Sequence, residues 1–465
     1  MKFADKYAKI FQFLLPTPFT IAVILTFITF AIAFLFTGNT ELSNAAYAIK
    51  LVGYWEEGLW NNGLMVFAMQ MMLILVLGHV LALSPLVEKG ISKITQYANN
   101  TAKAALFVSF FTIIVAFFNW GLGLIFGAIF ARKIAEHAVK QNLKINYPLI
   151  GAAGYIGLMV WHGGISGSSL TKVAESGHLS NMMQGILSLE QISKLPVQIS
   201  FSETVFSPMN LFSSIAVLII LPCFLYLLGK NESNTKVPTI QINSKQDDKA
   251  STKHSGAEKL DYSKFMAYGF AAIILAFAFY KITLEKEPSK LGFITPNYLN
   301  FLLFGLGILL HQNFHSFLKA IDQAISGAAG ILIQFPLYFG IMGIMKSSGL
   351  VDELSTFFVS ISNDTTFPVF TMISAGLVNI FVPSGGGQWA VQGPIIVQAS
   401  QVLGISLPKS ILALAYGDQL TNMLQPFWAL PLLGITGLKA KEILPYTLLM
   451  MLVGGAIYLT ALLIF

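Results

Sequence analysis

Long runs of apolar residues recur along the whole chain, and they constrain its fold more than any other feature. Many of these runs have about 18 residues or more, which is the length that an α-helix needs to cross the hydrocarbon core of a bilayer. Only 11% of the 465 residues are charged and 55% are hydrophobic, whereas an ordinary soluble domain has about 25% charged residues. The sequence therefore predicts a membrane protein with many spanning helices, and it excludes a single water-soluble core.

The apolar segments cover residues 18–36, 64–84, 104–131, 147–170, 201–228, 265–280, 297–312, 323–346, 366–402, 410–434 and 443–464. The first segment follows several lysines, as in a signal peptide, but its apolar run is too long for the core of such a peptide. We therefore expect it to be the first span.

The distribution of charge fits membrane topology. The net charge of +6 comes almost entirely from lysines in short loops between apolar segments, where basic residues set the orientation of membrane proteins. It does not form the basic patch that nucleic-acid binding requires. The single cysteine, Cys223, excludes an intrachain disulfide and a cysteine-based metal site.

Two apolar segments are interrupted near their middle by residues that break a helix. Residues 104–131 contain Asn-Trp-Gly-Leu-Gly at 119–123, and residues 366–403 contain Pro-Ser-Gly-Gly-Gly at 383–387. A single crossing by the first segment would put the following cations opposite the lysine-rich N-terminus, against the usual charge bias. A hairpin that enters and leaves on one side avoids this conflict, provided that protein or a wet cavity surrounds its tip. We therefore predict an all-α polytopic membrane protein with about nine transmembrane helices, two re-entrant hairpins and a cytoplasmic N-terminus.

The order of these segments predicts an inverted-topology repeat. Residues 1–228 form the first repeat, residues 229–264 are polar enough to be a flexible cytoplasmic linker, and residues 265–296 form a connecting span and loop. Residues 297–465 then repeat the first order with every direction reversed. Such repeats are typical of secondary transporters, which bind their substrate where the two repeats meet.

Each half also contains a later helix that is itself broken, at residues 147–170 and 410–434. A broken helix offers free N–H groups at one end and free carbonyl groups at the other, so it can hold an anion and a cation. Close helix packing is the alternative explanation for the glycine and serine clusters. The two hairpin tips, the two broken helices and one nearby acid supply the candidate site, which consists of Asn119, Trp120, Gly121, His162, Gly163, Gly164, Ser166, Ser168, Ser169, Glu203, Pro383, Ser384, Gly385, Gly386, Gly387, Gln388, Trp389, Asp418, Thr421, Asn422 and Gln425.

Three of these residues are ionisable. Asp418 precedes Asn422 by four positions, so both side chains face one side of the helix. An acid inside the membrane indicates a cation ligand or a proton carrier, with a structural hydrogen bond as the alternative. His162 would either titrate near neutral pH or serve as a buried structural histidine. Glu203 lies near the outer end of a span, where helix capping explains it as well as transport does.

The scarcity of arginine bears on the substrate. The one arginine, Arg132, lies in a predicted loop, so a carboxylate would be bound by N–H and hydroxyl groups and not by a bidentate guanidinium. This favours a small monoanion over a tightly bound dicarboxylate. Trp120, Trp161 and Trp389 would form apolar walls around a short acyl tail, with ordinary core packing as the alternative.

The tips and breaks resemble those of the bacterial short-chain fatty acid transporters. The resemblance rests on residues 118–123, 160–168, 203–210 and 383–389, and it extends over nearly the whole chain apart from the linker. More distantly, residues 383–385 and 417–422 are similar to motifs of the ion transporter superfamily. The resemblance implies uptake of short-chain monocarboxylates such as butyrate or acetoacetate, two re-entrant hairpins and a homodimer. Gly386 and Gly387 stand where many superfamily members have serine or alanine, so the number of coupled cations does not carry over.

The sequence thus predicts a secondary active transporter in the bacterial inner membrane that takes up short-chain fatty acids by cation-coupled alternating access, without enzymatic activity. Its expected partners are a small carboxylate, the lipid bilayer and a second copy of the chain, with no nucleic acid. The coupling cation is Na+ or H+, and no other cofactor is expected. A sodium ion would lie near a set of polar residues, namely Asn119, Ser166, Ser384, Asp418 and Asn422.

Other functions remain open at this stage. An exporter or exchanger of larger aromatic or dicarboxylate anions is the main alternative. A membrane hydrolase or acyltransferase is disfavoured because residues 163–167 lack the Gly-x-Ser-x-Gly pattern and no acid is placed in sequence to orient His162. An ion channel is a further alternative. The acyl chain length, the direction of net transport, the oligomeric state and the reach of Glu203 are not determined.

Overall fold

The computed structural model describes residues 16–38, 42–184, 187–231, 235–240, 256–284 and 295–465. These residues form helices and turns, with an isolated antiparallel β-bridge between Ile145 and Lys236. The all-helical architecture is therefore confirmed for the described part. The predicted linker, residues 229–264, lies in large part outside the described residues, and its flexibility stays a prediction.

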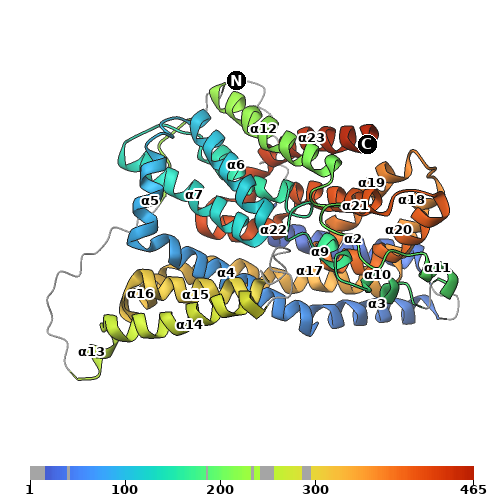
Figure 1. Cartoon of the computed structure of the whole chain (residues 1–465), viewed down its shortest axis with the longest axis horizontal. Helices are drawn as coiled ribbons and strands as arrows, with labels where there is room; N and C mark the ends of the chain where they lie inside the picture. Colours follow the sequence, from blue (N-terminus) through green and yellow to red (C-terminus); the bar gives the residue numbers. More distant parts are fainter. Residues whose placement is uncertain (1–15, 39–41, 185–186, 232–234, 241–255, 285–294) are drawn as a thin grey trace.

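The helices of the two halves can be followed in Figure 1. The first half forms α2 (Pro18–Phe36), α3 (Asn44–Leu59), α4 (Asn62–Leu83), α5 (Pro85–Thr95), α6 (Thr101–Phe118), α7 (Trp120–Lys140), α8 (Tyr147–Tyr155), the 3-10 helix η1 (Ile156–Met159), α9 (Ser168–Val173), α10 (His178–Met182), α11 (Leu189–Ser193) and α12 (Pro208–Lys230). The second half forms α13 (Glu258–Asp261), α14 (Lys264–Leu284), α15 (Pro296–His311), α16 (Phe314–Ala324), η3 (Ile325–Ala328), α17 (Ala329–Ser347), α18 (Leu350–Ser360), α19 (Phe367–Phe381), α20 (Gly385–Leu403), α21 (Leu407–Thr421), η4 (Asn422–Leu424), α22 (Pro426–Thr436) and α23 (Ala440–Ile464).

Seven helices of the described part are long and apolar enough to cross a bilayer, namely α2, α4, α6, α12, α14, α17 and α23. Large apolar side chains on their outer faces are exposed, among them Phe265, Ile273 and Phe279 of α14. An apolar outer surface of this kind fits contact with lipid. The structure therefore supports a multi-pass membrane protein, while the predicted total of nine spans with two re-entrant hairpins stays a prediction.

The same order of elements occurs twice along the chain. The first half contains, in order, a long helix (α4), a short helix (α5), a helix pair (α6 and α7), a helix ending in a 3-10 turn (α8 and η1) and a last long helix (α12), with the short helices α9 to α11 before α12. The second half has α17, α18, α19 with α20, α21 with η4, and α23 in the same order, with α22 before α23. The predicted repeat requires this match, and its inversion across the membrane stays a prediction.

The hairpin helices and the broken helices pack together through glycines. A Cβ atom on Gly127 of α7 would lie 2.0 Å from the carbonyl oxygen of Gly154 in α8. A Cβ atom on Gly417 of α21 would lie 2.1 Å from the carbonyl oxygen of Met372 in α19. Backbones approach this closely only where no side chain intervenes. Close helix packing therefore explains why glycine is needed at positions 127 and 417.

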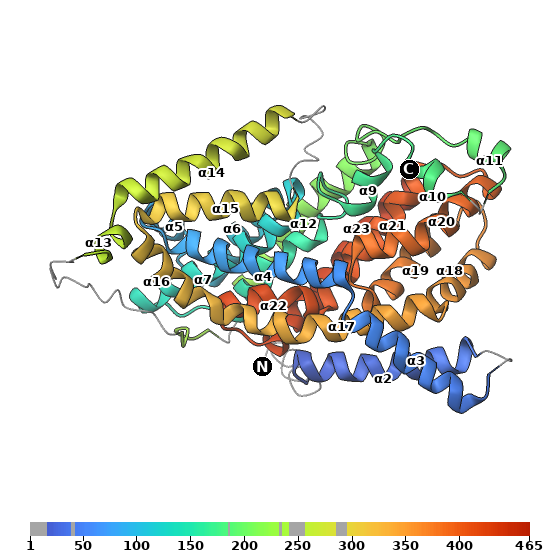
Figure 2. The ribbon, with the colours of Figure 1, turned by 90° about the horizontal axis from the view of Figure 1, so that it is seen from below.

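The remaining helices lie around this centre. Figure 2 shows α14 at one edge, outside α15, and α2 and α3 at the opposite edge. Both α2 and α3 pack against α17, and α14 packs against α15. In this view the two helix pairs and the broken helices lie between these two edges.

Candidate functional site

Both helix pairs turn at an extended residue whose side chain caps the next helix. Between α6 and α7, Asn119 (φ −151°, ψ 122°) accepts a hydrogen bond from the N–H of Leu122 through its side chain. Before α20, Ser384 (φ −150°, ψ 103°) accepts one from the N–H of Gly387. Each such cap is worth about 1 kcal/mol. The breaks lie where the sequence predicts the two hairpin tips.

The first tip is fixed to the first broken helix. The hydroxyl of Ser166 accepts a hydrogen bond of 3.0 Å from the N–H of Trp120. The N–H of Ile165 donates to the carbonyl of Phe117 at 2.9 Å, and a Cβ atom on Gly164 would lie 2.5 Å from the same carbonyl oxygen. Two segments that the sequence analysis treats separately thus form one unit.

The second tip reaches the first broken helix from the other half of the chain. A Cβ atom on Gly385 would lie 2.7 Å from Cη2 of Trp161 and 2.9 Å from Cε1 of His162. A Cβ atom on its neighbour Gly386 would lie 3.9 Å from Cβ of Ser168. The structure therefore brings the second tip and the first break together, as the predicted site requires.

A histidine and an acid from the two halves meet at the two breaks. The Nδ1 atom of His162 lies 3.3 Å from Oδ2 of Asp418, and both side chains are completely buried. The N–H of Ser169 donates to Nε2 of His162 at 3.1 Å, so Nε2 is an acceptor and the ring proton is on Nδ1, facing the carboxylate. The two facing atoms are not aligned for a hydrogen bond, and neither has another partner in the described part of the chain.

This contact bears on one sequence-based argument against an enzyme, because it places Asp418 beside His162, which nothing in the sequence spacing reveals. The hydroxyl of Ser169 also lies 2.9 Å from Nε2 of His162, which gives a serine, a histidine and an aspartate in series. The backbone N–H of Ser169 already occupies the Nε2 lone pair, however, and Ser169 is fully buried. The imidazole is therefore not free to take the serine proton as a hydrolase requires.

A buried asparagine that the sequence analysis missed holds the second break together. The side-chain N–H2 of Asn379, in α19, donates to the carbonyl of Asp418 at 2.7 Å, to the hydroxyl of Thr421 at 2.9 Å and to Oδ1 of Asn422 at 2.7 Å. The side chain of Gln425 donates in turn to the carbonyl of Asn379. Thr421, Asn422 and Gln425 are therefore gathered as predicted, and a polar residue inside an apolar hairpin arm was the signal for Asn379.

The backbone of Gly163 is not free, contrary to the expectation that the first break exposes its N–H groups. Its N–H donates to Oε1 of Gln419 at 3.0 Å, and its carbonyl accepts from Asn210 at 2.8 Å. Tyr155 secures the second break from the other half, since its hydroxyl donates to the carbonyls of Asn422 and Gln425. The breaks are thus linked across the halves by side chains that the sequence analysis did not assign.

Glu203 does not join this cluster. The predicted span over residues 201–228 begins only at Pro208, and Glu203 lies exposed in the preceding turns. Its carboxylate accepts hydrogen bonds from the N–H and the hydroxyl of Ser200 at 2.9 and 2.7 Å. In this structure Glu203 therefore stabilises its own turn and caps no helix.

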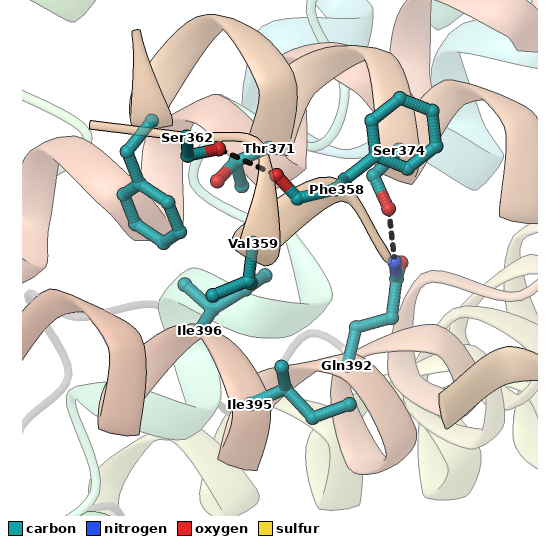
Figure 3. Close-up of a pocket in the computed structure, with 9 residues that line it drawn as sticks. Phe358, Val359, Ser362, Thr371, Ser374, Gln392, Ile395 and Ile396 are labelled. Atoms are coloured by element: carbon teal, nitrogen blue, oxygen red, sulfur yellow. Dashed lines mark hydrogen bonds between the residues drawn. The ribbon is translucent and has the colours of Figure 1, made fainter. Parts of the chain in front are cut away.

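A pocket lies beside the second hairpin, between α18, α19 and α20 (Figure 3). Within it the side chain of Gln392 donates to the hydroxyl of Ser374 at 3.2 Å. Gln388, one turn earlier in α20, donates to Gln392 at 2.7 Å and to the carbonyl of Ala375. Gln388 is therefore buried inside its own hairpin, and the pocket contains none of the predicted site residues.

The side chains expected around a sodium ion make hydrogen bonds in this structure, and the sodium site stays a prediction. The side-chain oxygens of Asn119, Ser166 and Ser384 accept hydrogen bonds from backbone N–H groups. Asp418 and Asn422 lie together at the second break, where Nδ2 of Asn422 is 3.5 Å from Oδ1 of Asp418. Among the described residues no three histidine, cysteine, aspartate or glutamate side chains gather as a metal site.

A second histidine holds the second hairpin from outside. The indole N–H of Trp389 donates to Nε2 of His178, in α10, at 3.0 Å. Burial lowers the pKa of His178 below its usual value, Glu175 opposes this shift and Lys172 adds to it. Since protonation of Nε2 removes the acceptor, the bond requires the neutral ring.

We expect this bond to weaken as the pH falls. The folded state resists protonation of His178, so its contribution to stability is present above the unfolded pKa of about 6.5 and is lost as the pH falls through the lower folded pKa. Loss of one hydrogen bond of about 1 kcal/mol should raise amide hydrogen exchange in α10 about fivefold between pH 7.5 and 5.5, after correction for intrinsic rates. His178→Gln keeps an acceptor that does not titrate and should show no such change. Equal protection of the unsubstituted protein at both pH values would contradict the prediction.

Aromatic side chains from both halves meet beside the His162–Asp418 pair. The ring of Trp161 stacks on His162 with centroids 4.6 Å apart, and Trp120 lies 5.8 Å from Trp161. Trp428, near the start of α22, lies 5.3 Å from Trp120 and 6.2 Å from Trp161. Trp428 was not predicted from the sequence, and Trp389 lies with His178 and not in this cluster.

Comparisons with known proteins show the family of this chain. The family described as "Short chain fatty acid transporter" matches residues 2–465. A protein of Escherichia coli is 36% identical over 455 residues, which are 97% of this chain and 96% of that protein. A protein of Haemophilus influenzae is 36% identical over 456 residues, 96% of each chain. The names of both give short-chain fatty acid transport as a provisional function.

Two solved transporter structures are also similar. The YdaH transporter of Alcanivorax borkumensis has 14% identity and a TM-score of 0.42, over 95% of this chain and 97% of its own. MtrF of Neisseria gonorrhoeae, described with a class of antimetabolite efflux pumps, has 15% identity and a TM-score of 0.40. The match covers 99% of this chain and 96% of MtrF. At these scores the likeness carries no argument about function. The match along the whole chain and the two relatives at 36% identity show that this chain belongs to the short-chain fatty acid transporter family, whose members are transporters and not enzymes.

Proposed function

We propose that the chain is a secondary active transporter that takes up small monocarboxylates, such as butyrate or acetoacetate, together with a cation. The observation that carries this proposal is the buried contact between His162 and Asp418, because it joins the two broken helices, one from each half of the chain. An ionisable group inside a membrane protein is a functional candidate by default. A site that is shared between two halves is what alternating access requires.

The proposed mechanism moves one part of this shared site against the other. The cation would bind at or near the Asp418 carboxylate, and the substrate would bind between the two tips and the two breaks. Rocking of the hairpins and broken helices against the surrounding helices would then expose the site to each side in turn. In this proposal the repeat is inverted, the two helix pairs are re-entrant hairpins, and the protein is a dimer in the bacterial inner membrane with a cytoplasmic N-terminus.

The surroundings of the site favour a monocarboxylate. The buried residues in the described part of the chain include no lysine and no arginine. Arg132, in α7, bonds Glu136 at 3.1 Å and the carbonyl of Thr436, away from the breaks. Neutral donors would bind a single carboxylate weakly enough for release, whereas a second carboxylate would be left without a partner.

Uptake into vesicles tests the proposal. Purified protein in proteoliposomes should accumulate labelled butyrate under an imposed sodium or proton gradient, with saturation and above the leak into protein-free vesicles. The gradient that drives uptake names the coupling ion. Folded protein that gives no excess uptake under either gradient would contradict the proposal. Export or exchange of larger aromatic or dicarboxylate anions by the same vesicles would then identify the alternative function.

A further inference from the structure

Three buried hydrogen-bond donors near the breaks have no partner in the described part of the chain. They are the indole N–H groups of Trp161 and Trp428 and the hydroxyl of Tyr338. Trp161, Trp428 and Tyr338 are 2%, 3% and 1% exposed, respectively. Buried indole and phenol groups usually find an acceptor, so three unpartnered donors in one region indicate a ligand that supplies one.

These donors come from three elements and belong to one cluster of aromatic side chains. Trp161 lies in the first break and Trp428 lies in α22, with ring centroids 6.2 Å apart. Tyr338 lies in α17, and its ring is 5.0 Å from that of Phe427, which is itself 5.0 Å from the ring of Trp428. Phe427 and Trp428 are the first residues after Pro426, so the three donors lie around the start of α22.

The start of α22 is itself suited to an anion. Gln425 precedes this helix of 11 residues, and its side chain makes no capping bond. Both hairpin tips, in contrast, are capped by Asn119 and Ser384. Pro426 has no N–H group, so this uncapped helix start leaves the N–H groups of Phe427 and Trp428 directed outward at the positive end of the helix dipole. Broken helices of transporters bind anionic substrate groups in this way.

The rest of the cluster is apolar and fits a short acyl tail. The ring centroid of Phe67 lies 6.3 Å from that of Trp120 and 6.2 Å from those of Phe335 and Trp428. Phe335 stacks on Phe427 with centroids 3.9 Å apart. Neutral donors set among aromatic faces match the polar and the apolar end of a short carboxylic acid.

We propose that the indole N–H groups of Trp161 and Trp428, with the Tyr338 hydroxyl and the first turn of α22, bind the carboxylate of the transported acid. The inference rests on the proposed function and names the groups that replace an arginine at its site. Trp161 also stacks on His162, so the bound carboxylate lies next to the buried His162–Asp418 pair. Substrate and cation would thereby occupy neighbouring positions.

Binding measurements on the purified full-length protein test this assignment. Trp161→Phe and Trp428→Phe remove one N–H group each and keep an aromatic ring, and each should weaken butyrate binding at least tenfold in calorimetry. Butyramide, which is neutral and of similar size, should bind the unsubstituted protein poorly, and the preference for butyrate over butyramide should shrink in both variants. Trp55→Phe is the matched control. Its indole N–H is also buried without a partner among the described residues, but it lies in α3 against Gly340.

A direct measurement keeps the assignment testable if a variant fails to fold. In unsubstituted protein labelled with 15N-tryptophan, butyrate should shift two indole N–H resonances downfield and leave that of the exposed Trp60 in place. No indole shift at saturating butyrate, or butyrate affinities of both folded variants within twofold of the unsubstituted protein, would overturn the assignment. The proposed function would still stand in that case. Failure of the unsubstituted protein to bind or transport butyrate would instead refute the proposed function itself.

Discussion

Replacing Asp418 by asparagine is expected to lower the initial rate of gradient-driven butyrate uptake about 100-fold or more, which corresponds to about 2.7 kcal/mol. Among the buried residues described by the structure, Asp418 and His162 are the only ones with an acidic or basic side chain. Asparagine has almost the same shape as aspartate, but it carries no negative charge to attract a cation. The measurement is the initial rate of labelled butyrate uptake into proteoliposomes under the gradient that drives the unsubstituted protein.

The control for this variant is Asp352→Asn. Asp352 lies exposed in α18, so its replacement should change uptake less than twofold and show that loss of an acid alone is not the cause. Thermal unfolding of both variants should be compared, because Asp418 also accepts a bond from Asn422. If folded Asp418→Asn protein still concentrates butyrate under a sodium or a proton gradient, the Asp418 carboxylate is not the coupling site.

Much of the fold follows from local patterns in the sequence. The helix breaks at Asn119 and Ser384 are predicted because asparagine, proline, serine and glycine interrupt otherwise continuous apolar runs. The long spans follow from run length alone. Short helices such as α3, α5, α16 and α18 are not predicted, because their apolar residues alternate with polar ones and form no run. A periodicity of 3.6 residues was the available signal for them.

The contacts of the site are harder to predict, because they join distant parts of the chain. His162 and Asp418 are named separately in the sequence analysis, yet nothing local places one beside the other. Asn379 and Trp428 are missed because each stands in an apolar segment as a single residue without a motif. Tyr155 and Gln419 act through bonds to backbone groups of the opposite half, and only the packed structure reveals such partners.

The position of Glu203 shows that an apolar run can also predict a helix that is too long. Residues 201–206 are apolar enough to extend the predicted span, but α12 starts at Pro208 with Ser207 as its cap. Proline favours the first turn of a helix, since it lacks an N–H group and fixes φ. The Ser-Pro pair was therefore the better signal for the helix start, and it places Glu203 outside the helix.

The second large effect is expected at Gly385, where the second tip touches the first break. Alanine there would place Cβ 2.7 Å from Trp161 and 2.9 Å from His162. Neither ring can move aside easily, because they stack on each other and Ser169 and Asp418 hold the imidazole. Overpacking of this kind costs about 1–3 kcal/mol. If the tip must approach His162 during transport, Gly385→Ala should therefore lower the butyrate uptake rate about 5-fold to 100-fold, and Gly385→Val more.

Alanine at the adjacent Gly386 is the control that separates the effect of the contact from the effect of alanine on helix stability. Gly386 is in the same first turn of α20, but a Cβ atom there would meet only Cβ of Ser168, at the ordinary contact distance of 3.9 Å. Alanine is favoured over glycine inside a helix by about 0.5–1 kcal/mol, so Gly386→Ala should unfold at the same or a higher temperature and lose much less uptake than Gly385→Ala. Equal uptake rates for the two alanine variants would mean that the tip does not need to approach His162 during transport. A tenfold difference, with both variants folded, would show that the contact between the two halves is part of the transport cycle.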